Sequence, residues 1–444
     1  MTVTPATAAT PTAHADAVVV GAGPAGSAVA RFLADAGRDV VLLEKHTFPR
    51  DKVCGDALTP RAVRALSRLG LVAEAEGTAP GWHRQRGLRM YGGRVTRRAD
   101  GTTDHEVVLD LPWPELPDWP AHSLTATRWV FDEALARHAE AGGAQLWQGC
   151  EVTGPVWLTD SQERIAGVTW HQRDADGAVT ASGSVRAPVV VACDGNSSRL
   201  GVAVGLHRDQ ARPLGVAVRA YYDHQRPDLD MMEAFLDVEA DGVLLPAYGW
   251  IFPLADGTVN VGWGQLDTSS HFRGVSYPKV LDAWVSGFPA EWGLSADTRQ
   301  GRPASAGLPM SHNRHPAAHK GLLLVGDAAG MVNPFNGEGI SYAIEAGALA
   351  AEAVDRALAT RDDAPLAGYP AAVANEWGGY YRLGVTFAEL IGNPTIMRWC
   401  RDHGMRSQVL MRLAYRFLAH LVDRRSADSI DRIINTVTRA VPAA

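Results

Sequence analysis

The sequence predicts an α/β protein in which a parallel sheet flanked by helices is interrupted by a second, antiparallel sheet. Short apolar runs at 17–20, 40–43 and 321–325 are typical of parallel strands buried on both faces. Between them, residues 214–266 are rich in β-branched and aromatic side chains, which favours the antiparallel sheet. From residue 366 onward the pattern is helical.

The first apolar run leads directly into a glycine-rich turn and a helix. Ala17–Val20 is followed by GAGPAG, and apolar residues then recur at helical spacing as far as Gly37. In such a unit the three glycines permit the tight turn, the approach of a pyrophosphate and close helix packing. An acid at the end of the next strand can accept hydrogen bonds from a ribose. We therefore expect a bound dinucleotide rather than a purely structural turn, contacted by Gly21, Gly23, Pro24, Ala25, Gly26, Glu44 and Lys45.

Composition limits the classes of function. With 444 residues, 46% of them hydrophobic and 20% charged, the chain suits two or three packed lobes. A net charge of −7 argues against a nucleic-acid partner, because phosphate backbones select basic surfaces. The four cysteines lack disulfide or metal spacing, which favours a reducing compartment. Because no stretch is apolar enough to span a membrane, we expect a cytoplasmic protein that touches the inner face of the membrane at most.

Turn residues and periodicity predict the remaining elements. Thr59-Pro60 is typical of a helix start, and Gly70 of its end. The segment at 113–120, WPELPDWP, is predicted to be a linker. Strands are expected over 88–111, 145–152, 165–172 and 185–191, and helices over 128–141 and 340–358.

These elements predict a discontinuous domain layout. The dinucleotide-binding domain is expected to comprise residues 16–80, 122–200 and 301–358, and the substrate domain residues 81–121 and 201–300. Residues 1–15 are expected to be a disordered lead-in, and 359–444 a helical C-terminal region. Small-molecule sites are common at such domain boundaries.

A second glycine-rich segment follows the strand at 321–325. It consists of GDAAG at 326–330 and NPFNGEGI at 333–340. Together with the GxGxxG turn, it resembles the FAD-binding elements of the flavoproteins that include aromatic hydroxylases, flavin halogenases and geranylgeranyl reductases. The resemblance implies a Rossmann-like FAD-binding domain with an inserted antiparallel β-sheet substrate domain. It also implies FAD as cofactor, with Asp327 at its ribitol, Gly337, Gly339 and Ile340 at the isoalloxazine, Arg128 near the phosphates and the Val152 backbone at the adenine.

Two further segments favour the reductases of this group. Lys52-Val53-Cys54-Gly55-Asp56 is similar to the KxCG segment of the geranylgeranyl reductase family, in which the cysteine lies near the flavin. YGWIFP at 248–253 is similar to the segment that lines the prenyl cavity of that family, which implies that Tyr248, Trp250, Phe252 and Pro253 bind substrate. A lone cysteine or a row of aromatic residues also occurs in cores without any function. The resemblance covers residues 16–358. Within it, the stretches FPRDKVCGDALTPRAV, YGWIFPLADGTVNVG and VGDAAGMVNPFNGEGISYA resemble actinobacterial menaquinone reductases in particular.

This resemblance implies an FAD-dependent oxidoreductase that saturates a carbon–carbon double bond in a polyprenyl chain, such as that of menaquinone or a geranylgeranyl lipid. Cys54 is then a candidate catalytic residue that positions the alkene or relays a proton. The electron donor is NAD(P)H or a redox protein, since no second GxGxxG marks a nicotinamide domain. The alternatives are a monooxygenase that tailors a small aromatic compound or natural product, and a non-catalytic escort protein that binds prenyl groups.

Two features have a purely structural alternative. His312, His315 and His319 lie in a loop without an acid or thiol nearby, so we expect no metal site. Residues 410–422 form an apolar stripe flanked by arginines, including Arg424 and Arg425. Such a helix can lie on an anionic membrane surface or pack against its own protein.

Overall fold

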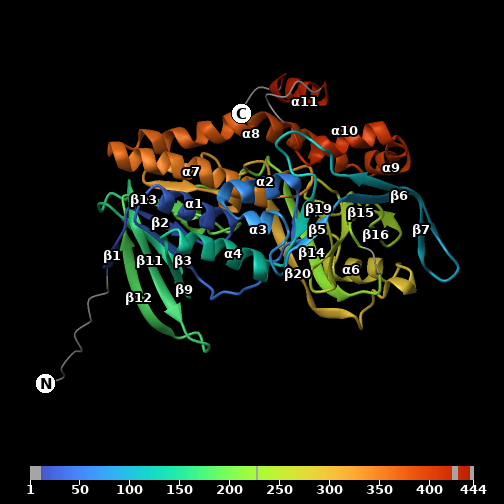
Figure 1. Cartoon of the computed structure of the whole chain (residues 1–444), viewed down its shortest axis with the longest axis horizontal. Coiled ribbons are helices and arrows are strands. Elements are labelled where there is room, and N and C mark those ends of the chain that lie inside the picture. The colour runs from blue at the N-terminus through green and yellow to red at the C-terminus, as the bar shows by residue number, and fades with distance from the viewer. Residues whose placement is uncertain (1–11, 227–228, 423–428, 441–444) are drawn as a thin grey trace.

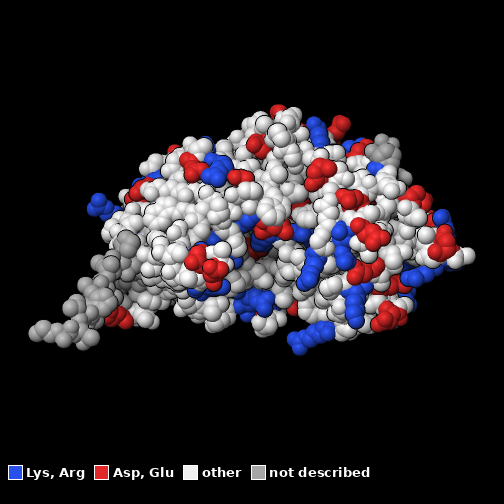
Figure 2. Space-filling model, turned by 90° about the horizontal axis from the view of Figure 1, so that it is seen from below, with Lys and Arg blue, Asp and Glu red and all other residues white. Residues whose placement is uncertain are grey.

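The computed structural model describes residues 12–226, 229–422 and 429–440. Two lobes lie side by side, and long helices cover both along one edge (Figure 1). This architecture confirms the predicted layout of a mostly parallel sheet flanked by helices, a second, mostly antiparallel sheet and a helical C-terminal region. On the face shown in Figure 2, acidic and basic side chains are interspersed.

A six-stranded sheet forms the centre of the first lobe. All its neighbouring strands pair in parallel except β21 with β22, and β2 and β3 are buried throughout. The apolar runs therefore form the doubly covered sheet that they predict. The strand order is β21 (Ala318–His319), β22 (Leu322–Leu324), β13 (Val189–Ala192), β2 (Ala17–Val20), β3 (Val40–Glu44) and β9 (Gln145–Gln148).

The helices of this lobe begin and end close to the predicted residues. In α2 (Pro60–Leu69) the Thr59 side chain caps the start by accepting from the Ala62 N–H, and Gly70 ends it in a left-handed conformation. The helix α1 (Pro24–Asp35) packs against α7 (Ile340–Thr360), where a Cβ on Gly347 would lie 3.0 Å from that of Ala28. The other three helices here are α3 (Val72–Ala75), α4 (Arg128–Ala141) and α5 (Arg199–Ala203), all within the described residues.

A separate four-stranded sheet corrects two expectations. It consists of β1 (Thr12–His14), β12 (Val179–Arg186), β11 (Ile165–Arg173) and β10 (Glu151–Trp157). The end of the expected disordered lead-in is thus a strand, because Thr12–His14 pairs in parallel with β12; residues 1–11 lie outside the described part. The expected strand over 185–191 is wrong as one element. Its first residues belong to β12, and the chain passes through Ala187-Pro188 into β13 of the other sheet.

A seven-stranded sheet forms the second lobe. Its pairs are antiparallel except β15 with β6. The strand order is β20 (Arg299–Pro309), β14 (Leu214–Asp223), β19 (Thr258–Leu266), β18 (Ala247–Pro253), β15 (Met232–Phe235), β6 (Gly87–Arg97) and β7 (Thr103–Pro112). Because β20 pairs along β14, residues 301–309 belong structurally to this sheet and not to the first lobe. The helix α6 (Tyr277–Val285) packs on one face.

Two small sheets and three short 3₁₀ helices complete the described part of the fold. A three-stranded sheet contains β4 (Ala57–Leu58), β8 (Ser123–Thr125) and β5 (His83–Gln85), and β16 (Glu239–Ala240) pairs with β17 (Val243–Leu244). The short 3₁₀ helices are η1 (Ala290–Trp292), η2 (Gly326–Ala329) and η3 (Gly404–Arg406).

The C-terminal helices lie across both lobes (Figure 1). In α8, Trp377 and Tyr381 are buried in the core of the first lobe, whereas Met405 of η3 is buried with residues of β7 in the second. The helices are α8 (Ala364–Ile391), α9 (Pro394–Asp402), α10 (Gln408–Leu418) and α11 (Ser429–Ala440). Within the described part of the chain, none of the helices has the length and apolarity to cross a bilayer. Arg424 and Arg425 of the predicted basic flank lie outside the described residues.

The core of the second lobe depends on Phe235, which is fully buried and stacks on Tyr91 with ring centroids 4.3 Å apart. We expect Phe235→Ala to lower the free energy of unfolding by about 3–5 kcal/mol, since it leaves a cavity among aromatic rings. Denaturant unfolding of the purified protein measures this change. The control Val108→Ala removes an exposed side chain of β7 and is expected to change stability by less than about 0.5 kcal/mol. Equal midpoints for the two variants would contradict the assignment of this core.

Candidate active site

A cavity of about 420 Å³ lies where the two lobes meet. Its walls come from the β2–α1 turn, the end of β3, the loop that follows it, α4, β10 and the segment after β22, with Leu308 of β20 on the side of the second lobe. Most of the residues predicted to contact cofactor line it, namely Gly21, Gly23, Pro24, Ala25, Glu44, Lys45, Cys54, Arg128, Val152, Asp327, Gly337, Gly339 and Ile340. Sequence reasoning missed other lining residues, among them Arg50, Arg199 and Val332.

The glycine-rich turn is shaped for a diphosphate. A Cβ on Gly26 would lie 1.8 Å from the Gly21 carbonyl oxygen, whereas a Cβ on Gly23 would meet nothing within 4 Å. Gly26 therefore allows the start of α1 to pack directly against the Gly21 backbone, and Gly23 leaves its own backbone open to the cavity. The first turn of α1 has no side-chain cap and no acidic residue. Its free N–H groups and the helix dipole suit a phosphate.

Glu44 is held at the end of β3 by three donors. Its Oε2 accepts from the Ala22 N–H at 3.0 Å and from Arg50 at 3.2 Å, and its Oε1 accepts from the His46 N–H at 3.0 Å. Burial of a carboxylate is costly unless it is paired and hydrogen-bonded, and these contacts supply both. The acid is thus fixed beside the glycine turn, where the sequence predicts a ribose.

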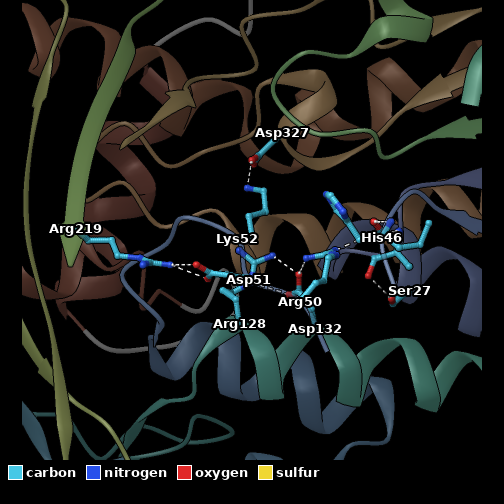
Figure 3. A network of polar contacts seen from close by, with 11 residues as sticks. Ser27, His46, Arg50, Asp51, Lys52, Arg128, Asp132, Arg219 and Asp327 are labelled. Atoms are coloured by element: carbon cyan, nitrogen blue, oxygen red, sulfur yellow. Dashed lines mark hydrogen bonds and ion pairs between the residues drawn. The ribbon is translucent and has the colours of Figure 1, made fainter. Parts of the chain in front are cut away.

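Arg50 continues this network to α4 (Figure 3). Its Nη1 donates to the fully buried Asp132 at 2.6 Å, and Arg128 donates to both oxygens of Asp132 at 2.6 and 2.7 Å. Burial alone lowers the pKa of Arg128, but the charge of Asp132, with a contribution from Cys54, raises it above its usual range. Arg128 therefore stays cationic at the cavity wall, which Cys54 also lines.

The opposite wall carries the second glycine-rich segment. Lys52 points toward Asp327, with Nζ 3.5 Å from Oδ2 (Figure 3). The Tyr248 hydroxyl donates to the Asn336 carbonyl at 2.8 Å and lies 3.4 Å from where a Cβ on Gly337 would stand. Burial raises the pKa of Tyr248 to about 12, with Cys54 as the smaller cause. Tyr248 thus supports the turn predicted to hold the isoalloxazine.

One face of the seven-stranded sheet carries the predicted substrate-binding aromatic residues. Across β14, β19 and β18, three rows lie in register: Ala217–Gly264–Tyr248, Arg219–Gly262–Trp250 and Tyr221–Asn260–Phe252. The glycines leave room for the rings, since a Cβ on Gly262 would lie 2.3 Å from the Trp250 ring. Side chains alternate along a strand, so Pro253 lies on the other face. Its contact with substrate, like that of the three aromatic residues, stays a prediction.

Gly55 and Cys54 connect this face to the cavity. A Cβ on Gly55 would lie 3.3 Å from the Phe252 ring, and Asn260 donates to the Cys54 carbonyl at 2.9 Å. Cys54 lines the cavity, whereas Gly55 and Gly26 lie behind its surface. The KxCG segment thus brings the thiol to the cavity and packs its glycine against the aromatic strand.

The histidines at 312, 315 and 319 do not gather into a ligand set. Among the described residues, no three His, Cys, Asp or Glu side chains lie close enough together to hold a metal ion. Burial lowers the pKa of His312 to about 3, so it remains neutral.

The glycine geometry predicts two different failures. Gly26→Ala is expected to destabilise the apoprotein, because its Cβ overlaps the Gly21 carbonyl. Gly23→Ala is expected to keep the apoprotein's melting temperature but to weaken FAD binding on the order of tenfold, through lost backbone contacts with the diphosphate. Thermal melts of the apoprotein and FAD titration separate the two effects. Gly368→Ala, where a Cβ meets nothing within 4 Å, is the control. Unchanged FAD affinity in Gly23→Ala would place the diphosphate elsewhere.

Comparison with known proteins identifies the family to which the chain belongs and its cofactor. The FAD binding domain family matches residues 14–372. The menaquinone reductase of Mycobacterium tuberculosis is 36% identical over 423 residues, which cover 94% of both chains. The digeranylgeranylglycerophospholipid reductase of Methanosarcina mazei is 28% identical over 353 residues, or 78% of this chain and 76% of that protein.

A solved structure extends the comparison to the fold. The geranylgeranyl bacteriochlorophyll reductase-like protein of Thermoplasma acidophilum superposes with a TM-score of 0.73, covering 96% of this chain and 100% of that one. At 20% identity this likeness shows the shared fold alone. Together with the sequence matches, it confirms the predicted family: the chain belongs to the FAD-binding flavoproteins, among the geranylgeranyl and menaquinone reductases, and FAD is its cofactor.

Proposed function

We propose that this protein is an FAD-dependent reductase that adds two hydrogen atoms across a carbon–carbon double bond of a polyprenyl chain, with the side chain of menaquinone as the favoured substrate. The observation that carries the proposal is that Cys54 lines the cavity while the next residue, Gly55, packs against the rings of Phe252 and Trp250 on the aromatic strand, which itself lies outside the cavity lining. The identity of 36% to a menaquinone reductase across nearly the whole chain supports the choice of substrate.

The residues of the site fit FAD. The free N–H groups of α1 and Arg128 would receive its phosphates, Glu44 its ribose, Asp327 its ribitol, and the backbone at Gly337 and Gly339 its ring. The reduced cofactor supplies a hydride to the alkene. We assign its two electrons to NAD(P)H or a redox protein.

The protein's own side chains orient the alkene. The Tyr248 hydroxyl fixes the turn at Asn336, and the ring faces of Tyr248 and Trp250 provide an apolar wall against the prenyl chain. An isolated alkene accepts hydride poorly, so positive charge develops during its reduction, and aromatic faces attract such charge. Cys54, beside Arg128 and Tyr248, holds the alkene or a proton at the flavin end.

Exposed apolar side chains on α8, α9 and α10 support a further element of this proposal, a peripheral contact with an anionic membrane. Trp399 is 60% exposed and Val409 80% exposed, and Leu390 and Leu410 are exposed nearby in sequence. Amphipathic helices with arginines on the polar side bind such surfaces. Because the proposed substrate is a lipid, a contact with the membrane brings the protein to its substrate.

The mass of the product tests the activity. When purified protein carrying chemically reduced FAD is incubated without oxygen with a polyprenyl quinone, the lipid is expected to gain about two mass units. The same mixture without protein is expected to show no change in the mass of the lipid. Cys54→Ala is expected to bind FAD but to form product about 100-fold more slowly. With oxygen and NADPH present, a product heavier by about sixteen units would instead indicate a monooxygenase. Lack of FAD uptake would favour an escort protein.

The membrane contact has its own test. Trp399→Glu combined with Val409→Glu is expected to reduce co-sedimentation with vesicles of phosphatidylglycerol and phosphatidylcholine, because it removes apolar area and adds negative charge. The matched control is Leu158→Glu, a 55% exposed apolar residue after β10. Equal sedimentation of both variants and the unaltered protein would contradict the contact, provided that all retain FAD.

A further inference from the structure

Asp56 is a buried carboxyl group in the loop that joins the lobes, two residues after Cys54. It has no exposed surface, and its φ of +62° lies in the left-handed region. Its Oδ2 accepts from the Tyr221 hydroxyl at 2.7 Å and from the Asn260 amide at 2.9 Å. Its Oδ1 has no hydrogen-bond partner among the described residues. An acceptor buried without a partner is unfavourable for a carboxylate, and protonation of the acid removes the charge that lacks this partner.

The groups around Asp56 act in opposite directions on its protonation. Arg219 and Tyr221 face it from β14, Asn260 from β19 and Arg128 from α4. Burial is the largest effect and raises the pKa of Asp56 to about 6, although the hydrogen bonds and both arginines act to lower it. A raised pKa keeps the proton on the acid to a higher pH than on an ordinary aspartate.

Hydrogen bonds connect Asp56 to both sides of the proposed reaction space. The Asn260 amide donates to Asp56 and also to the carbonyl of Cys54, which lines the cavity. The Trp250 indole donates to Asn260 at 2.9 Å. Tyr221 lies on the same sheet face as the aromatic residues of β18 and is only partly buried. Its hydroxyl therefore links a buried acid to the face on which the prenyl chain is proposed to lie.

We propose that Asp56 stores the proton for the reduction and delivers it through the hydroxyl of Tyr221 to one carbon of the alkene. This inference rests on the proposed prenyl reductase function. The π bond breaks, a hydride from reduced FAD forms one C–H bond, and the Tyr221 hydroxyl proton forms the other. The ionised acid accepts from the Tyr221 hydroxyl; when Asp56 is protonated on Oδ2, this 2.7 Å hydrogen bond reverses and the acid donates to the Tyr221 oxygen. The Asp56 proton passes to that oxygen in the same step, and the carboxylate takes a new proton from water.

The position of Arg219 fits this transfer. Its guanidinium lies 4.3 Å from the Tyr221 ring centroid and is paired with both oxygens of Asp51 at 2.7 Å. Burial and the charge of Asp56 raise the pKa of Tyr221 above its usual range, and Arg219 acts against them. A cation over the ring stabilises negative charge that develops on the phenol oxygen as its proton leaves. Asp56 thus acts through Tyr221, as a positioning and proton-storing residue.

Asp56→Asn tests the proposal, since asparagine also tolerates a positive φ and keeps an acceptor for Tyr221. We expect this variant to bind FAD but to form the two-mass-unit product about 100-fold more slowly, and Asp56→Glu to recover part of the rate. In the unaltered protein, the rate is expected to fall as pH rises above about 6, because only the protonated acid serves. Asp56→Asn is expected to lose this pH dependence, which a purely structural role of the side chain does not predict.

Two further variants keep the test decisive. Tyr221→Phe removes only the linking hydroxyl and is expected to lower the rate at least about tenfold and to flatten the pH profile. Asp267→Asn, at the end of β19, removes a carboxyl that caps the Leu214 N–H away from the cavity and is the control, with the rate expected to be unchanged. If the unaltered protein reduces the lipid and either Asp56→Asn or Tyr221→Phe does so at the same rate, the proton route is wrong but the proposed function stands. An unaltered protein that forms no reduced lipid overturns the proposed function as well.

Discussion

The structure depends on the polar contacts of one loop, residues 50–56, which ties the dinucleotide lobe to the seven-stranded sheet (Figure 3). Arg50 is paired with Glu44 and Asp132 in the first lobe, whereas Asp51 is paired with Arg219 in the second. Most of these charges are buried, and a buried charge without its partner is strongly destabilising. The loop can therefore satisfy its charges only when both lobes are in place, and this requirement fixes Cys54 between them.

This arrangement separates cofactor binding from the choice of reaction. The glycine turn, Glu44 and the segment from Asp327 to Ile340 form a cradle that suits FAD whatever the substrate. The aromatic face of the inserted sheet, with its glycines at 262 and 264, supplies the apolar wall. Flavoproteins that share the fold can thus differ in chemistry through the inserted sheet, because function resides in the site and not in the fold.

Local sequence patterns predicted the helices whose ends and buried faces are determined by residues close by in the sequence. Thr59 and Gly70 bound α2 as expected, and the spacing of apolar residues predicted α1 and α4. The run at 185–191 misled because the end of β12 and the apolar strand β13, which belong to different sheets, are separated only by Ala187-Pro188. The role of β20 and the contacts of Asp56 could not be found from local patterns, since Tyr221 and Asn260 lie 165 and 204 residues further along the chain. Strand register, which decides such contacts, is set by tertiary packing.

The central claim is that this site saturates a polyprenyl lipid, and the lipids of cells test it most directly. Mass spectrometry of quinones and other prenyl lipids would compare a menaquinone-producing host with and without the gene for this protein. The account predicts a gain of about two mass units confined to one prenyl lipid, as expected for one hydride and one proton added to a double bond. An oxygenated product, or an unchanged lipid profile in cells that contain the FAD-loaded protein, would contradict it.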